Sequence, residues 1–182
     1  MPGWIIVIAI VAVVVLFGVG VYNSLISKRE MVRNSMGQIA AQVESRWDAL
    51  TNLIQATKNY EKHEAETLEK LTANRSRVTN TSSASEVEAD SKAFNSALSR
   101  LIAVAEAYPD LKANTIYQNT MDSVNRYEEN VRHSRMIFND TVTKYNRELQ
   151  VFPNNLFAGI FGFTKEEYFK NTEGKESMPM WN

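Results

Sequence analysis

Residues that could bind a metal or transfer a proton are few in this chain, and their spacing matches no metal-binding motif. The sequence has two histidines, His63 and His133, and no cysteine. Metal sites in helical bundles pair a histidine with a glutamate three residues earlier. Tyr60 holds that position before His63, and Glu61 and Glu64 stand at other spacings. The helix lengths inferred below separate the two histidines by more than about 20 Å. We therefore expect no metal site and no cofactor.

Motifs for catalysis are also missing from the sequence. It contains no glycine-rich phosphate loop, no nucleophile elbow and no pair of carboxylates that stands apart from ordinary helix charges. Glu106 and Asp110 flank Tyr108-Pro109, where they are better explained as residues that fix a turn. The net charge of −1 does not suit a nucleic-acid-binding surface, which is usually strongly basic. We expect a protein that is not an enzyme, has no catalytic residue and does not bind nucleic acid.

One uncharged apolar run near the N-terminus is long enough to cross a bilayer. It extends from Trp4 and Ile5 through Leu16 to Val21, and Tyr22 follows it. As a helix this run is about 27 Å long, close to the thickness of the hydrocarbon layer. Trp4 and Tyr22 stand at its two ends, where aromatic side chains meet the membrane interfaces. The run predicts a transmembrane anchor in residues 1–23.

The residues around this run decide between an anchor and a cleaved signal peptide, and they indicate the orientation. A signal peptide carries a basic residue before its apolar core, and residues 1–3 contain none. Lys28, Arg29 and Arg33 follow the run, and no charged side chain precedes it. Basic residues favour the cytoplasmic side, so we expect a retained anchor with the N-terminus outside and the remaining domain in the cytoplasm.

Residues 24–170 are expected to form a helical domain. Apolar residues recur there in alternating steps of three and four, the narrow stripe of coiled-coil-like packing. The first helix is predicted over residues 24–78, with a weaker, polar stretch at residues 57–66. Its stripe begins with Val32, Met36, Ile39, Val43, Trp47, Leu50 and Ile54.

Two further long helices follow a loop that is rich in serine and threonine. Ser85 and Glu88 have the spacing of a capping box, which predicts a second helix over residues 86–107. Pro109 ends or kinks that helix, because the residue before a proline avoids the helical region. A third helix is predicted over residues 111–151.

Five of the eight phenylalanines lie between residues 152 and 169. Such a cluster must be covered by something. It either forms a short fourth helix that caps the bundle, or contacts the membrane interface or a neighbouring subunit. Phe157, Phe161 and Phe163 are the candidate interaction residues here, and residues 171–182 are expected to be disordered.

The helix lengths do not match within one chain. The first soluble helix would rise about 75 Å from the membrane and the second would descend about 33 Å. Either the first helix bends in residues 57–66, or neighbouring chains cover the part of its apolar stripe that the shorter second helix does not reach. The second case motivates a hypothesis of self-association.

Several motifs occur together along the chain. The central one is Ala105-Glu-Ala-Tyr-Pro-Asp-Leu-Lys-Ala-Asn114, and Tyr22-Asn-Ser-Leu25 follows the apolar run. The first helix contributes Arg46, Asp48, Asn52, Leu53, Tyr60, His63, Glu64, Leu68 and Arg75. The third contributes Glu128, Asn130, Arg135, Phe138, Asn139, Val142, Tyr145 and Asn146. With these motifs, the sequence resembles the LemA family of bacterial membrane proteins along nearly its whole length.

The resemblance implies an all-α fold: an N-terminal transmembrane helix, then an up-and-down antiparallel bundle of three long helices and a short C-terminal helical element. It implies a single-pass protein of the bacterial cytoplasmic membrane and supplies no catalytic residue. Relatives occur among magnetosome-membrane proteins. Tyr108 lies in the central motif and is a candidate interaction residue. Family members commonly have a small residue in place of Trp47, so Trp47 is a candidate subunit contact.

Two functions are compatible with these observations. The first is a non-enzymatic scaffold that contacts the lipid bilayer, forms homo-oligomers and organises or remodels the membrane. The second is an accessory or signalling module that binds another membrane protein, such as a protease or a sensor.

Overall fold

The computed structural model describes residues 2–58, 72 and 77–170, and every regular element in this part of the chain is a helix. The predicted all-α class is therefore confirmed. The helices are α1 (Gly3–Thr57), α3 (Ala84–Ala107), α4 (Pro109–Ala113), α5 (Thr115–Glu148) and α6 (Asn154–Ile160).

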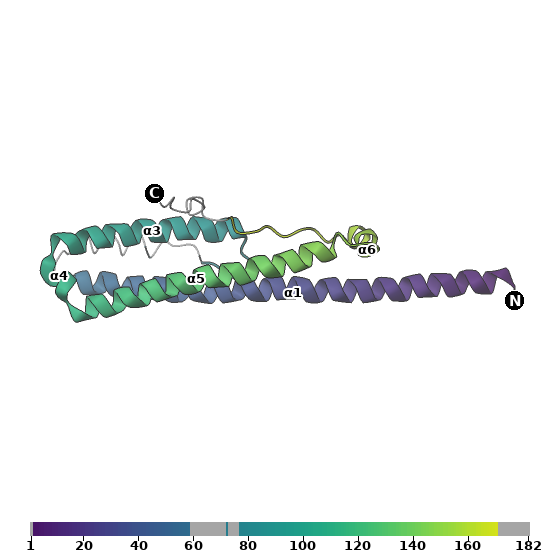
Figure 1. Cartoon of the computed structure of the whole chain (residues 1–182), viewed down its shortest axis with the longest axis horizontal. Coiled ribbons are helices and arrows are strands. Elements are labelled where there is room, and N and C mark those ends of the chain that lie inside the picture. The colour runs from purple at the N-terminus through teal and green to yellow at the C-terminus, as the bar shows by residue number, and fades with distance from the viewer. Residues whose placement is uncertain (1, 59–71, 73–76, 171–182) are drawn as a thin grey trace, which may run out of the picture.

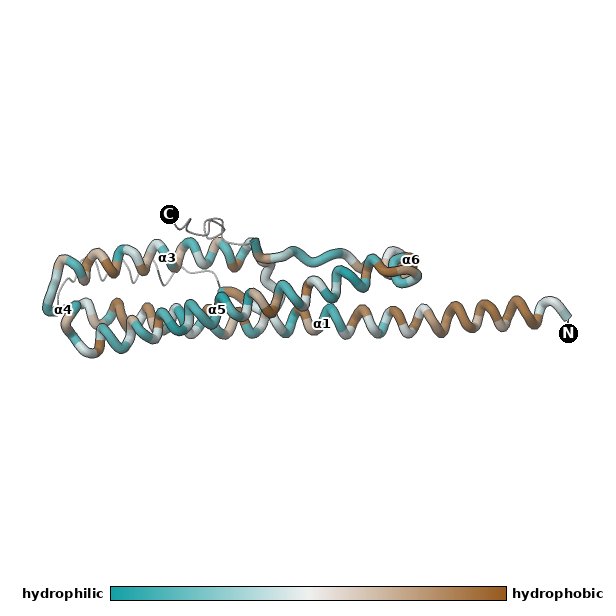
Figure 2. The backbone as a smooth tube through the Cα atoms, in the orientation of Figure 1, coloured by the Kyte–Doolittle hydropathy of each residue, from teal (hydrophilic) through white to brown (hydrophobic). Residues whose placement is uncertain are grey.

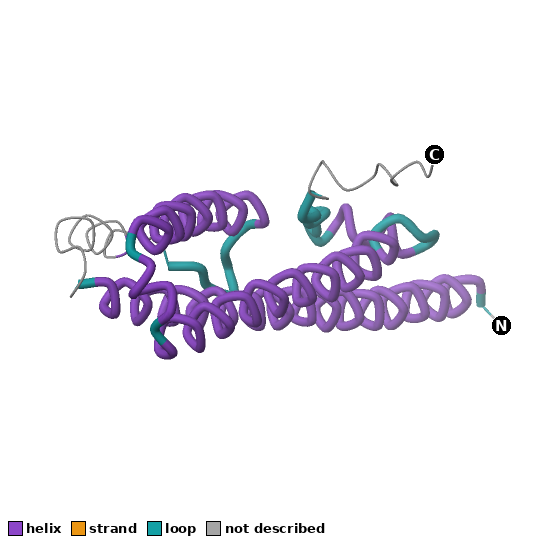
Figure 3. Tube along the Cα trace, turned by 60° about the vertical axis from the view of Figure 1, so that its left-hand side comes forward, coloured by secondary structure: helices purple, strands orange, loops and turns teal. Residues whose placement is uncertain are grey.

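The helices form an elongated bundle around the C-terminal part of α1 (Figure 1). The shorter N-terminal part of α1 extends alone. Helix α3 runs in the same direction as α1, short α4 turns the chain at the far end, and α5 returns antiparallel to α1. Helix α6 then lies beside α1 where this isolated part begins, an arrangement that a rotated view also shows (Figure 3).

Helix α1 is continuous from the apolar run into the bundle. No proline occurs within its 55 residues, so nothing removes a backbone hydrogen bond where the anchor meets the bundle. The predicted stripe of this helix is buried over its described length. It comprises Val32, Met36, Ile39, Val43, Trp47, Leu50 and Ile54.

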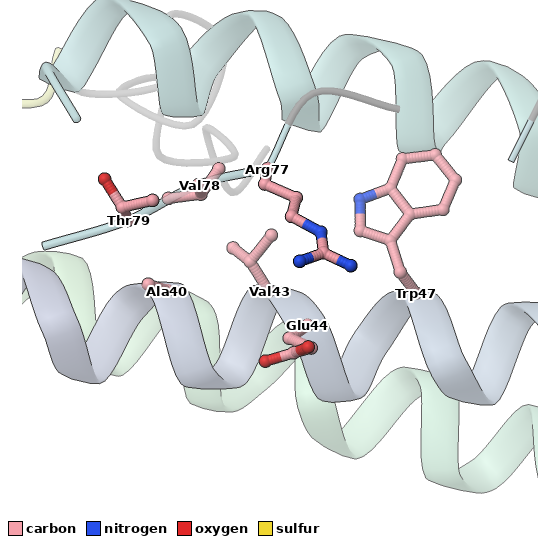
Figure 4. A pocket seen from close by; sticks show the side chains of 7 residues that line it. All are labelled: Ala40, Val43, Glu44, Trp47, Arg77, Val78 and Thr79. Carbon is pink, nitrogen blue, oxygen red and sulfur yellow. The ribbon is translucent and has the colours of Figure 1, made fainter. Parts of the chain in front are cut away.

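The prediction of one helix over residues 24–78 is wrong. Helix α1 ends at Thr57, and Val78 lies in a non-helical segment. A continuous helix would separate Val43 from Val78 by about 52 Å. Instead both residues line one cavity of about 230 Å³ together with Trp47 and Arg77, which points from the returning chain toward α1 (Figure 4). Val43 and Val78 therefore lie side by side, and most of the stretch 57–66, where a bend was expected, lies outside the described residues.

The second helix begins two residues earlier than predicted. Ser83, not Ser85, forms the capping box: its Oγ accepts a bond from the Glu86 N–H at 3.2 Å, and the Glu86 carboxylate accepts one from the Ser83 N–H at 2.7 Å. The motif was predicted correctly, but its position was not. Glu88 instead accepts a hydrogen bond from the backbone N–H of Lys170 at 3.1 Å.

The predicted third helix is divided in two. Helix α4 contains Pro109 in its first turn, and Asn114 then interrupts the helix. The Asn114 Oδ1 accepts a bond from the Ile116 N–H at 2.8 Å, so Asn114 caps the start of α5. Helix α5 ends at Glu148, three residues before the predicted end.

The expected direction of the second helix is also wrong. Because α3 runs away from the anchor and α5 returns to it, apolar residues of α3 and α5 are buried within one chain (Figure 1). The helix-length argument for self-association therefore no longer holds. The buried apolar residues of these helices include Val87, Phe94, Leu101, Ala105, Tyr117, Val124, Val131, Phe138, Val142 and Tyr145.

A buried ionic cluster joins the three long described helices. The Arg46 guanidinium, 0% exposed, donates to both Glu128 oxygens at 2.9 and 2.7 Å and to Asp90 Oδ2 at 2.9 Å. The indole Nε1 of Trp47 donates to Asp90 Oδ1 at 2.9 Å. The Phe94 ring lies under the guanidinium, with its centre 4.2 Å from Arg46 Cζ, and packs edge-on against Trp47. Arg46 therefore connects α1 to α3 and α5.

The expectation that Trp47 makes a subunit contact is wrong. Its side chain is 1% exposed, and its polar nitrogen is satisfied inside the chain. A large residue on the apolar stripe fills the bundle core here.

We predict that Asp90→Ala destabilises the protein by about 3–5 kcal/mol, because it leaves the buried Arg46 charge without one of its two carboxylates and the Trp47 N–H without its acceptor. Urea unfolding of the full-length protein in detergent micelles, followed by circular dichroism, measures this. Glu129→Ala is the control, since Glu129 pairs with Arg132 at an exposed site and should change little. Equal unfolding midpoints for the two variants would contradict the prediction.

Candidate functional site

The candidate site lies where the apolar N-terminal part of α1 meets the bundle. Helix α6 brings Phe157 against the last turn of the apolar run, with the Phe157 and Phe17 ring centres 5.6 Å apart. Gly18 makes room for this ring, because a Cβ atom at Gly18 would lie 2.9 Å from Phe157 Cε1. A larger residue at position 18 would displace the ring, so glycine permits the close packing of α6 on the anchor.

Two more phenylalanines surround the first residue after the run. The Tyr22 ring packs edge-on against Phe161 and Phe163, with centres 5.2 and 5.8 Å apart. The Arg29 guanidinium lies over the Phe163 ring, 5.2 Å from its centre. A cation over a ring face is attracted by the ring quadrupole. The aromatic cluster therefore connects the anchor to the first basic residues after it.

The other face of α6 is exposed and apolar. Leu156 is 57% exposed and Ile160 is 76% exposed, and residues four apart share one face of a helix. Phe152, just before α6, is also 76% exposed. The apolar colouring of the anchor continues onto α6 (Figure 2). The site thus has an inner face against α1 and an outer face that no described residue covers.

An extended segment after α6 runs back along α5, held by two asparagines. The Asn146 side chain forms a pair of hydrogen bonds with the backbone of Glu166, at 2.9 and 3.0 Å. Asn139 forms the same pair with Phe169, at 3.0 and 2.9 Å. The two asparagines are seven helical residues apart and their partners are three extended residues apart, and both separations are about 10 Å. The extended segment can therefore bind both asparagines at once. We call residues 162–170 the strap.

Two titratable groups contact the strap, and burial changes the pKa of both. The Tyr145 hydroxyl donates to the Thr164 carbonyl at 3.0 Å. Burial and the Glu166 carboxylate raise the pKa of Tyr145, which keeps this hydroxyl a donor. Burial lowers the pKa of Arg135, whose guanidinium lies 5.0 Å from the centre of the Phe169 ring. Both groups serve to hold the strap on α5.

The predicted anchor residues lie on the isolated N-terminal part of α1 and at its junction with the bundle. Trp4, Ile5 and Leu16 are 64%, 41% and 72% exposed, as a membrane-facing helix would be. Val21 is buried and Tyr22 is 42% exposed, because the bundle and α6 begin to cover α1 there.

The predicted interaction residues do not form one group. Phe157, Phe161 and Phe163 come together on the anchor. Tyr108 lies at the opposite end of the bundle, between α3 and α4, where its carbonyl accepts from the Leu111 N–H at 3.0 Å. Trp47 lies in the core.

Several important residues were not predicted as site residues. Arg46, Asn139 and Asn146 appeared only as family-matching positions, and Gly18 and Arg29 only as part of the anchor and its basic flank. An arginine within an apolar stripe and two asparagines seven residues apart on one helix are signals that could have indicated these contacts.

No group of three or more potential metal ligands lies close together among the residues that the structure describes. His133 is exposed on α5. His63 and its neighbouring glutamates lie outside the described residues.

The fold and the site define a membrane protein with one N-terminal apolar helix that continues into a helical bundle. An 18-residue window of α1 has a mean hydropathy of 3.1, and 11% of it is buried within the chain. The LemA family profile matches residues 35–180. The chain belongs to the LemA family.

Several bacterial proteins are similar to this chain. Magnetosome protein MamQ 2 of Paramagnetospirillum magneticum is 36% identical over 77 residues, and MamQ of Magnetospirillum gryphiswaldense is 34% identical over 76. Each match covers 42% of this chain and 28% of the relative. Protein LemA of Metamycoplasma hominis is 28% identical over 142 residues, covering 77% of this chain and 64% of that protein. This chain therefore matches little more than a quarter of the length of each of these MamQ proteins.

We predict that Asn146→Ala speeds hydrogen exchange of the Glu166 amide, because the amide loses its acceptor. The local opening free energy should fall by about 1–2 kcal/mol. Exchange measured by mass spectrometry on the reconstituted protein tests this. Asn130→Ala is the control, since its amide donates to Gln42 at an exposed site away from the strap. Unchanged exchange at Glu166 in the first variant would contradict the role given to the strap.

Proposed function

We propose that this protein is a non-enzymatic scaffold that assembles at the membrane and organises or remodels it. The observation that carries the proposal is the continuity of α1 through the anchor and the bundle. Because one helix forms both parts, the bundle cannot rotate freely on a flexible linker. A rigid rod of defined length is suited to holding partners at a fixed height above a bilayer.

The similarity to the magnetosome proteins supports this proposal. MamQ 1, MamQ 2 and MamQ are named for an association with magnetosomes. The shared region suggests that this chain also acts within a membrane-bound assembly.

A surface near the membrane provides a candidate contact for self-assembly. A groove of about 320 Å³ lies between α1 and α5. Met31 and Ile137 line it and are 57% and 41% exposed. Lys28 and Lys144 also line it. We assign the self-association to this groove, because the apolar stripes are already covered within one chain.

We further propose that the bundle lies in the cytoplasm of a bacterial cell and that the anchor crosses the inner membrane. Lys28, Arg29 and Arg33 follow the span within α1. Lys165 adds a positive charge at the same end of the bundle, beside Val32 and Arg33 in a surface groove. A concentration of basic residues beside a span favours the cytoplasmic side.

The orientation can be tested with single cysteines, since the natural chain has none. A maleimide that does not cross membranes should label Pro2→Cys in intact spheroplasts and should label Ile116→Cys only after permeabilisation. Ile116 is 67% exposed at the far end of the bundle. Labelling of Ile116→Cys in intact spheroplasts would contradict the proposed orientation.

The assembly can be tested by measuring the particle mass of the extracted full-length protein, with electron microscopy on the same sample. We expect a defined mass well above that of one 20.7 kDa chain. Ile137→Glu should reduce the mass, because it introduces a charge into the groove, whereas Ile116→Glu should not.

A single chain in the detergent particle would contradict the scaffold proposal. That outcome would favour the second candidate, an accessory module that binds another membrane protein such as a protease or a sensor. The Phe-rich end of the bundle would then be the surface to search for that partner.

A further inference from the structure

We propose that residues 149–164, with α6 at their centre, insert into the bilayer interface as a second membrane contact beside the anchor. The occupant of the exposed face of α6 is lipid at the boundary between headgroups and acyl chains. This inference rests on the membrane anchorage in the proposed function and does not require self-assembly.

The composition of this segment suits the membrane interface. Sixteen consecutive residues from Leu149 to Thr164 contain no Asp, Glu, Lys or Arg. Charged residues resume at both borders, with Glu148 before the segment and Lys165 after it. The segment is thus an uncharged island between charged stretches.

The contacts with α1 set the depth of the segment. Phe157 packs on Phe17 and Gly18, which precede the end of the apolar run at Val21 by three to four residues. At the rise of an α-helix this is about 5–6 Å inside the span. Amphipathic segments at membrane interfaces bury their apolar face to a depth of about 5–10 Å. If the span is in the bilayer, the Phe157 ring is at that depth.

The two faces of α6 have different partners. Phe157 and Phe161 face the anchor, and Ala158 is 3% exposed between them. Leu156 and Ile160 point away from the protein, with 57% and 76% of their surface exposed. A protein in water rarely leaves a contiguous apolar patch uncovered. Lipid covers this patch, because α6 packs on the anchor through Phe157 and the anchor beside it leaves Val13 and Leu16 65% and 72% exposed.

A polar side chain at the start of α6 is held on the bundle side. Asn154 donates to the Glu148 carboxylate at 2.9 Å. That carboxylate also pairs with Lys28 at 3.2 Å. These contacts attach the start of α6 to the charged end of the bundle. The helix therefore has one polar attachment, one face on the anchor and one face toward lipid.

Single-cysteine labelling of the full-length protein tests this inference. The protein carries a fluorescent label at Ile160→Cys and is reconstituted into vesicles of phosphatidylcholine and phosphatidylglycerol. Quenching by brominated phosphatidylcholine reports contact with lipid, and quenching by iodide reports contact with water. Leu16→Cys is the lipid control, since Leu16 lies on the span and is 72% exposed. Ile116→Cys is the water control, since it is a similarly exposed isoleucine at the other end of the bundle.

We expect the label at residue 160 to be quenched by the brominated lipid nearly as strongly as the label at residue 16, and by iodide several-fold less than the label at residue 116. Adding Ile160→Asp to a Leu156→Cys protein should reduce lipid quenching at residue 156. Unchanged helicity by circular dichroism establishes that this variant is folded.

Three results would overturn the inference. Iodide quenching at residue 160 equal to that at residue 116 would remove the second contact and leave the anchor intact. Protection from both quenchers would show that protein, such as a second copy of the chain, covers this face. Iodide quenching at residue 16 as well would remove the membrane anchorage, and with it the proposed function.

Discussion

The arrangement of the bundle depends on one buried guanidinium. A stripe of apolar residues fixes which face of a helix is buried, but it leaves the axial register open, because a slide along the stripe buries similar residues. Arg46 limits this freedom, since a slide along the stripe would move its guanidinium out of hydrogen-bond distance of Asp90 and Glu128. Buried ion pairs add little net stability compared with apolar contacts, but breaking one is costly. We therefore interpret the cluster as a determinant of register.

This register has a consequence at the membrane. Phe17 precedes Arg46 by 29 residues, and Phe157 follows Glu128 by the same number. Since α5 is antiparallel to α1 and paired with it at Arg46, the chain after Glu128 returns to the level of the anchor. The strap then turns back along α5 and is fixed there by Asn139 and Asn146. Contacts deep in the bundle thus determine the depth of α6 beside the anchor.

The sequence predicted the classes of element better than their arrangement. Composition and periodicity indicated the anchor, the buried stripe of α1 and the short helix α6. The direction of α3 was not predictable in this way, because a stripe defines a face and not a direction along the axis. The polar stretch after Thr57 and the mismatch of helix lengths were signals that the first helix is shorter than its stripe suggested. Trp47 was misinterpreted through a comparison with relatives, although its place on the stripe already indicated the core.

The membrane-facing end also explains why the Phe-rich segment, residues 149–164, carries no charged side chain. In water, the exposed side chains of Phe152, Leu156 and Ile160 would favour aggregation. Beside a transmembrane helix they face a solvent that is itself apolar, and no protein cover is required. The bilayer then acts on the bundle at two places, through the anchor and through α6. Two contacts on one rigid body oppose tilting as well as dissociation, whereas a single helix opposes only dissociation. A scaffold that sets the height and direction of its bundle needs both.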